Sequence, residues 1–137
     1  MKSILVDAGP LIALFDKSDS YHVQSIQFLK KYKGALLTTW PVVTETSHML
    51  AFSVLTQIAF LEWIKRGGLH VIEIEYSSIS RLIELCKKFR DVPMDLADAT
   101  LIVAAEERNI KEIATIDSDF YIYRDIRNRY LKNIFIR

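Results

Sequence analysis

The sequence predicts an α/β protein in which helices cover both faces of a mostly parallel sheet. Short apolar runs alternate along the chain with segments of helical periodicity, and strands separated by helices need crossover connections, which make neighbouring strands parallel. The first run, Ile4 to Val6, is an unbroken apolar stretch, as expected of a strand buried on both faces. Half of the 137 residues are apolar, enough for the core of one domain, so we expect residues 1–137 to form a single unit.

The composition excludes several other classes of protein. A formal net charge of +1 excludes a strongly basic nucleic-acid packing protein. The lone Cys86 excludes a disulfide framework and a cysteine-based zinc site, and Asp7 interrupts the apolar N-terminal stretch that would otherwise imitate a signal peptide. No apolar run approaches the roughly 18 residues of a spanning helix, so we expect a soluble protein of the cytoplasm, without membrane contact.

Proline and glycine mark the elements of the first half of the chain. Gly9-Pro10 breaks the first strand, and Pro10 suits the first turn of a helix that continues to Phe15. Gly34 ends a second helix, and Pro41 opens a third. The expected elements are a strand at residues 3–6, helices at 10–15 and 22–33, a strand at 35–39, and helices at 41–52 and 54–66.

The second half of the chain continues this alternation. Ser77 or Ser78 can cap a helix that reaches Phe89, and Asp95 can cap the helix after it. The expected apolar face of the first of these helices consists of Ile79, Leu82, Ile83, Leu85 and Cys86. The expected elements are a strand at residues 69–74, helices at 78–89 and 96–108, and strands at 112–116 and 133–136.

Two acidic residues directly follow expected strands. Asp7 comes after the first strand, and Asp117 comes after the strand at 112–116. Ligands of parallel sheets bind beyond the carboxyl ends of the strands, so both side chains are candidates for chemistry. A helix N-cap would also explain Asp7, and an Asx-turn would also explain Asp117.

Two further acidic residues occupy helix positions where apolar residues are expected. At helical spacing Glu45 lines up with the apolar Val42, Met49 and Phe52, and no Lys or Arg lies nearby in the chain to pair with it. Asp98 lies in the helix at 96–108, which is apolar almost all round and is therefore expected to be buried. A buried carboxylate without a partner becomes protonated or binds a cation. For Glu45, a long-range salt bridge is the alternative.

The four carboxylates together indicate a site for a divalent cation. Converging acids repel one another, so a positive charge has to hold them together, and hard oxygen ligands suit Mg²⁺ or Mn²⁺ better than zinc. Such an ion polarises a phosphoryl oxygen and lowers the pKa of a bound water, which is the chemistry of phosphodiester hydrolysis. No dinucleotide-binding, P-loop or nucleophile-elbow motif follows any expected strand.

Other polar residues are explained first by local structure. Asp95 and Asp119 suit capping positions, so they stay outside the set as neighbours that could assist the site. The three histidines, His22, His48 and His70, raise a metal-free alternative in which imidazoles act as acid and base. A helix start, a helix surface and a strand position favour structural roles for them instead.

A basic segment with interleaved aromatic residues lies near the end of the chain. Its cations are Arg124, Arg127, Arg129, Lys132 and Arg137, interleaved with Tyr123 and Tyr130 and offset only by Asp125. Such a flank beside an acidic metal pocket would suit RNA or DNA. A solvated surface with core aromatic residues is the alternative.

Four motifs in this order and spacing resemble those of PIN-domain ribonucleases, especially VapC-type toxins. They begin at Asp7 (DAGPLIAL), Thr44 (TE), Asp95 (DLADA) and Thr115 (TIDSDF), so the resemblance spans essentially the whole chain. One departure is Ala8, since many toxin members have Ser or Thr after the first aspartate. The resemblance implies a PIN-like three-layer α/β/α sandwich with a mostly parallel central sheet. Residues implied as the metal-binding and catalytic quartet, for Mg²⁺ or Mn²⁺, are Asp7, Glu45, Asp98 and Asp117, with Thr115 as a polar neighbour.

The resemblance also implies an activity and partners. Its members cleave RNA, commonly form homodimers and, as toxins, are inhibited by an antitoxin protein that occupies the site. The leading hypothesis is therefore a divalent-metal-dependent endoribonuclease, with a role as the toxin of a type II toxin–antitoxin pair. The alternatives are a non-catalytic RNA- or protein-binding module of the same fold and a phosphatase acting on small phosphoesters.

Overall fold

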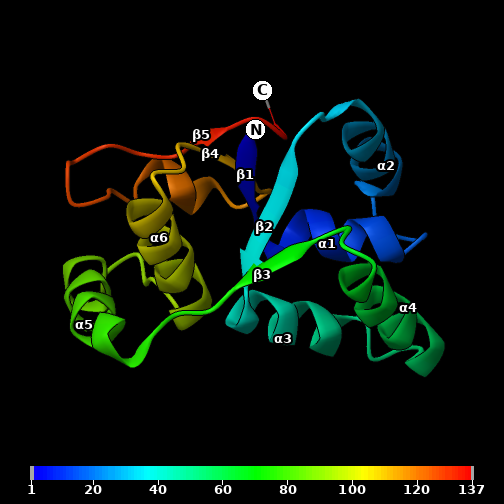
Figure 1. Cartoon of the computed structure of the whole chain (residues 1–137), viewed down its shortest axis with the longest axis horizontal. Coiled ribbons are helices and arrows are strands. Elements are labelled where there is room, and N and C mark those ends of the chain that lie inside the picture. Colours follow the sequence, from blue (N-terminus) through cyan, green and yellow to red (C-terminus); the bar gives the residue numbers. More distant parts are fainter. Residues whose placement is uncertain (1, 137) are drawn as a thin grey trace.

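A five-stranded parallel sheet forms the centre of the computed structural model, which describes residues 2–136 (Figure 1). The strand order is β3-β2-β1-β4-β5, and every neighbouring pair is parallel. The strands are β1 (Ser3–Val6), β2 (Ala35–Thr39), β3 (His70–Ile72), β4 (Glu112–Ala114) and β5 (Lys132–Asn133). The apolar β1 is central, as its composition predicts, and Leu5 pairs with both neighbouring strands.

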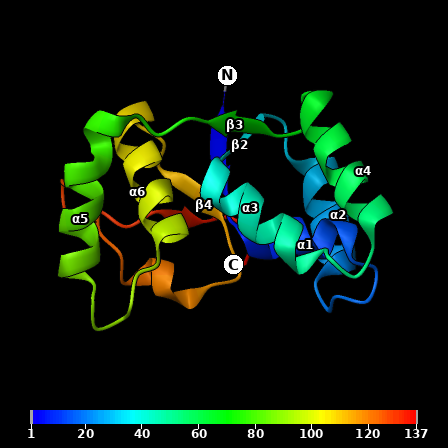
Figure 2. The same ribbon diagram turned by 90° about the horizontal axis from the view of Figure 1, so that it is seen from below.

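Helices cover both faces of this sheet. Figure 2 shows α5 and α6 on one side and α1, α2 and α4 on the other, which confirms the expected three-layer α/β/α sandwich. The helix α3 runs past the carboxyl edge of the sheet and contacts both α1 and α6. The helices are α1 (Ala8–Phe15), α2 (His22–Lys31), α3 (Trp40–Met49), α4 (Val54–Lys65), α5 (Ile79–Lys88) and α6 (Leu96–Arg108), with 3₁₀ turns η1 (Tyr76–Ser78) and η2 (Ser118–Tyr121).

Local capping explains where the two helices beside the site begin. Asp7 accepts the N–H of Ala8, so α1 begins there and not at the predicted Pro10. Asp95 accepts the N–H of Asp98 and starts α6 as predicted. Asn109 ends α6 in the left-handed conformation, at φ 53°. Both acidic residues at these helix starts are thereby placed at the carboxyl edge of the sheet.

Several predicted elements are shorter in the structure. The second helix ends at Lys31, the third strand spans only His70–Ile72, and the last strand spans only Lys132–Asn133. The expected apolar face of α5 is only partly covered, because Leu85 is buried whereas Ile79 and Ile83 are 43% and 49% exposed. This helix lies at the outside of its layer, where it packs mainly against α6. None of the helices in residues 2–136 has both the length and the apolar character to span a membrane.

Candidate metal centre at the carboxyl edge of the sheet

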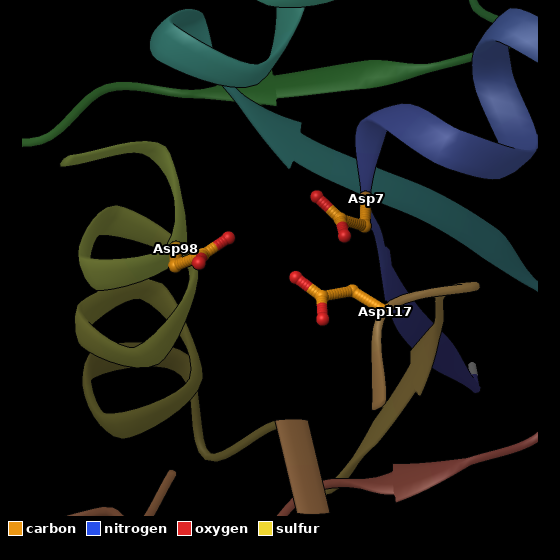
Figure 3. Close-up of side chains that lie close together, drawn as sticks. All are labelled: Asp7, Asp98 and Asp117. Atoms are coloured by element: carbon orange, nitrogen blue, oxygen red, sulfur yellow. The ribbon is translucent and has the colours of Figure 1, made fainter. Parts of the chain in front are cut away.

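Three aspartates from separate segments meet at the carboxyl edge of the sheet. Asp7 follows β1, Asp117 follows β4, and Asp98 lies in the first turn of α6. Their side chains point toward one another (Figure 3), and one carboxylate oxygen from each lies within 4.8 Å of the others. Asp7 and Asp98 are each 7% exposed, whereas Asp117 is more open to solvent. The sequence predicted this convergence of two strand-end acids with a buried helix acid.

The hydroxyl of Thr115 links two of these aspartates. It donates to Oδ2 of Asp7 over 2.8 Å and accepts the N–H of Asp117 over 3.0 Å. The other oxygen of Asp7, Oδ1, accepts the N–H of Ala8 over 2.8 Å. Asp7 is therefore both the N-cap of α1 and a member of the cluster, so its capping role does not exclude a role in the candidate site.

Asp117 combines a turn with the cluster in the same way. Its Oδ1 accepts the N–H of Asp119 over 2.9 Å, which is the Asx-turn that the sequence left open, and η2 follows. Asp119 itself is not among the three clustered residues. Asp95, which is exposed, lines the same pocket next to Asp98 while it caps α6.

Asp98 receives a hydrogen bond that the sequence did not reveal. The hydroxyl of Tyr123 donates to Oδ2 of Asp98 over 2.9 Å, and Tyr123 is completely buried. Its burial confirms the alternative of a core aromatic residue, and the suggestion that Tyr123 in the basic flank could stack on bases is wrong. A buried carboxylate needs a donor, but the two residues are 25 positions apart in the chain, so no local spacing identifies the donor.

Glu45 reaches the same pocket from α3. The pocket, of about 360 Å³, is lined by the three aspartates together with Glu45, Met49 and Ile12. Glu45 is exposed, and so are the neighbours predicted to bury it, Met49 and Phe52, at 56% and 62%. The predicted burial is therefore wrong for Glu45, Met49 and Phe52 and correct for Val42, because α3 packs inward through the face that carries Val42, Val43 and Thr46. Within residues 2–136 no Lys or Arg forms an ion pair with Glu45.

Burial and mutual repulsion raise the pKa values of the clustered acids. Desolvation raises the pKa of Asp98 to about 8, the charges of Asp7 and Asp95 add to the rise, and the Tyr123 hydrogen bond opposes it. Desolvation likewise raises the pKa of Asp7 to about 6, against the hydrogen bonds from Thr115 and Ala8.

Two further groups show the same effect. The pKa of Glu45 is raised, mainly by desolvation and then by the charges of Asp95 and Asp117. Desolvation and the Asp98 carboxylate also raise the pKa of Tyr123, which keeps its hydroxyl protonated as a donor. No Lys, Arg or His lines the pocket in the described part of the chain. The oxygen donors and the excess negative charge fit a hard divalent cation.

The histidines do not contribute to the pocket. His22 contacts the carbonyl of Ala13 through Nδ1 over 2.7 Å, and His48 and His70 are exposed. None of the three lines the acidic pocket. The metal-free alternative based on imidazole therefore has no geometry to support it.

The basic flank differs from its prediction in which aromatic residues are exposed. Tyr121 and Tyr130 are 49% and 54% exposed and have ring centroids 6.4 Å apart. The guanidinium of Arg124 lies 5.0 Å from the centre of the Tyr130 ring. Arg129 pairs with Asp125 over 3.2 Å. The predicted cation Arg137 lies outside the described residues.

The fold and the pocket define an α/β protein with a candidate divalent-metal centre at the carboxyl edge of its sheet. The family model of the PIN domain matches residues 4–126. The chain therefore belongs to the PIN-domain family.

The chain is similar to proteins named VapC and to a toxin–antitoxin complex. Ribonuclease VapC26 of Mycobacterium tuberculosis is 23% identical over 116 residues, which are 83% of this chain and 86% of that protein. The solved structure of M. tuberculosis VapC20, described as a sarcin-ricin loop cleaving toxin, has a TM-score of 0.79 at 18% identity and covers 87% of this chain and 93% of its own. A toxin–antitoxin complex from Klebsiella pneumoniae has a TM-score of 0.65 at 19% identity, with 85% and 89% covered. The structural likenesses show the fold.

Proposed function

We propose that this PIN-domain protein is a divalent-metal-dependent endoribonuclease that hydrolyses RNA phosphodiester bonds. The observation that carries the proposal is the meeting of three carboxylate oxygens within 4.8 Å in a pocket that holds only acidic charge. A non-catalytic RNA-binding module gains nothing from acids that repel phosphates. The match to a protein named a ribonuclease supports the activity, and the fold of a toxin described as cleaving the sarcin-ricin loop supports the choice of RNA.

The proposed ligands of Mg²⁺ or Mn²⁺ are the acids that line this pocket. Asp7, Asp98 and Asp117 would hold the ion, and Glu45 would complete the acidic set from α3. A divalent cation supplies the positive charge that polarises a phosphoryl oxygen and acidifies water. No side-chain nucleophile is needed, which agrees with a pocket lined by carboxylates and apolar groups.

The chain's own residues would hold the acids in the required arrangement. Thr115 fixes the orientation of Asp7 and supports the backbone of Asp117 through the same hydroxyl. The pKa of Asp98, raised to about 8, means that the cation-free pocket retains a proton at neutral pH, whereas Asp7, with a pKa of about 6, is mostly ionised there. Binding of the cation would release the proton of Asp98, because a carboxylate ligand must be ionised.

We also propose that the protein is the toxin of a type II pair in the cytoplasm, with an antitoxin protein as partner and a homodimer as its assembly. The fold shared with a solved toxin–antitoxin complex supports the antitoxin. Coexpression with the product of a small adjacent open reading frame tests this part. Suppression of toxicity and copurification are expected, while growth inhibition that is unaffected by the neighbour would oppose the toxin role. Light scattering of the purified chain tests the dimer, and a monomeric mass would exclude it.

Cleavage of end-labelled total RNA tests the activity. We would incubate the wild type and Asp98→Asn with RNA in Mg²⁺, Mn²⁺ or EDTA. The wild type is expected to cut only with metal, and the variant not at all. RNA binding without turnover, with no dependence on metal, would favour the non-catalytic module. Hydrolysis of a chromogenic phosphate ester in place of RNA would favour a phosphatase.

A further inference from the structure

Tyr123 is buried in an apolar aromatic cluster, yet its hydroxyl is used on the candidate metal centre. Its ring lies between Phe89 and Phe120, with centroids 5.4 and 5.1 Å away in edge-to-face arrangements. No part of the residue is exposed to solvent. Packing from two sides therefore fixes where the ring, and with it the hydroxyl, can lie.

The backbone of Tyr123 ties the same residue to the segment that follows Asp117. Its N–H donates to the carbonyl of Asp119 over 3.1 Å, at the end of η2. Its hydroxyl crosses to Asp98 on α6, 2.9 Å away. One residue thus connects the two parts of the chain that bring Asp117 and Asp98 to the cluster.

The hydrogen bond leaves Asp98 with a defined division of its two oxygens. Oδ2 accepts the proton of Tyr123, and no other side chain of residues 2–136 donates to this carboxylate. One oxygen is therefore oriented by the protein, and the other is available to a cation. Carboxylate ligands of metals are commonly oriented by such partners, whose loss reduces metal affinity about 10- to 100-fold.

We propose that Tyr123 is a positioning residue that orients Asp98 for the divalent cation. A purely structural role would need only the ring, because a phenylalanine fills the same space between Phe89 and Phe120. The hydroxyl adds a polar atom inside an apolar cluster, and it is satisfied by the one carboxylate that α6 contributes to the cluster. The inference rests on the proposed function, since it assumes that Asp98 binds the cation.

A calorimetric titration of Mn²⁺ into the purified protein tests the proposal without any RNA. Tyr123→Phe removes the hydroxyl and retains the ring, and we expect it to raise the Kd for Mn²⁺ about tenfold. The matched control is Thr100→Val on α6, the helix that carries Asp98. Thr100 is also buried, and its hydroxyl bonds to Thr39 and to the carbonyl of Ala97 but to no carboxylate. Its loss is expected to lower Tm while the Kd stays within about twofold of wild type.

A double-mutant cycle separates positioning from a general loosening of the fold. In the Asp98→Asn background, adding Tyr123→Phe is expected to cause no further loss of Mn²⁺ affinity, because the hydroxyl acts through the carboxylate. An unchanged Kd in the Tyr123→Phe single variant would overturn the proposal, and so would an equal loss of affinity in both backgrounds. A wild type that fails to bind Mn²⁺ would overturn the proposed function as well. A wild type that binds Mn²⁺ beside an unaffected Tyr123→Phe would overturn the positioning role alone.

Discussion

Asp98 and Glu45 face one pocket from two helices, but only one of them is held in place. Asp98 is buried and receives a hydrogen bond from Tyr123, and its own N–H is fixed by Asp95. Glu45 is exposed on α3 and has no ion-pair partner among the described residues. Orienting a carboxylate before the cation arrives spares the entropy cost of ordering it on binding. The structure thus orients the carboxylate of Asp98 in advance, as the proposed cation site requires, whereas the exposed Glu45 has no such partner among the described residues.

The largest predicted difference between the Asp98 and Glu45 variants is in their affinity for Mn²⁺. Asp98→Asn removes the oriented carboxylate of the proposed site, so we expect Mn²⁺ affinity to fall on the order of 100-fold, to a level that calorimetry still measures, and RNA cleavage to fall to background. Glu45→Gln removes the charge of an exposed residue that lines the pocket, and we expect a loss on the order of tenfold in Mn²⁺ affinity. Calorimetry and the RNA assay measure both variants side by side. Equal losses of affinity in the two variants would break the distinction between a held and a free carboxylate.

The same distinction predicts that the hydroxyl of Thr115, which orients Asp7, contributes to Mn²⁺ affinity. Thr115→Val removes the donor to Asp7 and the acceptor for the N–H of Asp117, so we expect Mn²⁺ affinity to fall about tenfold. Thr46→Val is the control, because the buried hydroxyl of Thr46 donates only to the carbonyl of Val42 on α3. An effect of the same size at Thr46 would show that loss of any buried hydroxyl near the pocket suffices.

Much of the held arrangement was predictable from the sequence, because it depends on short-range patterns. The apolar run of β1 placed Asp7 at the strand end, and the cap at Asp95 placed Asp98 in the first turn of an apolar helix. Thr115 followed from the resemblance to PIN-domain proteins. Tyr123 did not, since its contact with Asp98 depends on how η2 returns toward α6.

The predictions that were wrong, for the Glu45 face and for the strand at 69–74, failed because each depends on contacts between distant segments. Helical periodicity shows that Glu45 and Met49 share a face but not whether another element covers it, and here it stays open. The predicted strand at 69–74 is shorter because pairing of β3 with β2 ends at Thr39 and Ile72, where β2 gives way to α3. Edge strands depend on the length of their single neighbour, which the pattern of one segment does not encode.

The burial of Asp98 predicts a pH dependence of stability when no cation is present. Its pKa rises to about 8 in the folded chain from 3.8, so between these values the folded state keeps a proton that the unfolded state has lost. The contribution of Asp98 to the free energy of unfolding is therefore fully present below about pH 4 and declines as the pH rises toward 8. Asp98→Asn cannot lose that proton, so we expect its Tm in EDTA to exceed that of wild type by at least roughly 3 °C at pH 8.

Thermal unfolding of both proteins in EDTA from pH 5 to 8.5 measures this difference. The difference in Tm between variant and wild type is the relevant quantity, because the titration of groups that do not interact with Asp98 cancels in it. It should be small at pH 5 and grow with pH. For the exposed Glu45 a much smaller change is expected from Glu45→Gln. If the difference in Tm between Asp98→Asn and wild type is the same at every pH, ionisation of the buried Asp98 carboxyl group does not destabilise the folded protein.

The smallest expected effect concerns Arg124, a positively charged side chain that hydrogen bonds hold in place as they hold Asp98. Arg124 donates to the carbonyls of Tyr121 and Tyr123 over 2.6 and 3.1 Å and lies over Tyr130, and it forms no ion pair within residues 2–136. Its oriented charge is therefore uncompensated, close in sequence to Asp117, and suits an RNA phosphate. In EDTA, Arg124→Gln should weaken RNA binding about three- to fivefold and reduce the salt dependence by about one ion, with Mn²⁺ affinity unchanged. Arg66→Gln at the C-cap of α4, where Arg66 already pairs with Glu62, should change neither quantity. Equal effects of the two variants would show that the basic flank acts only as general surface charge.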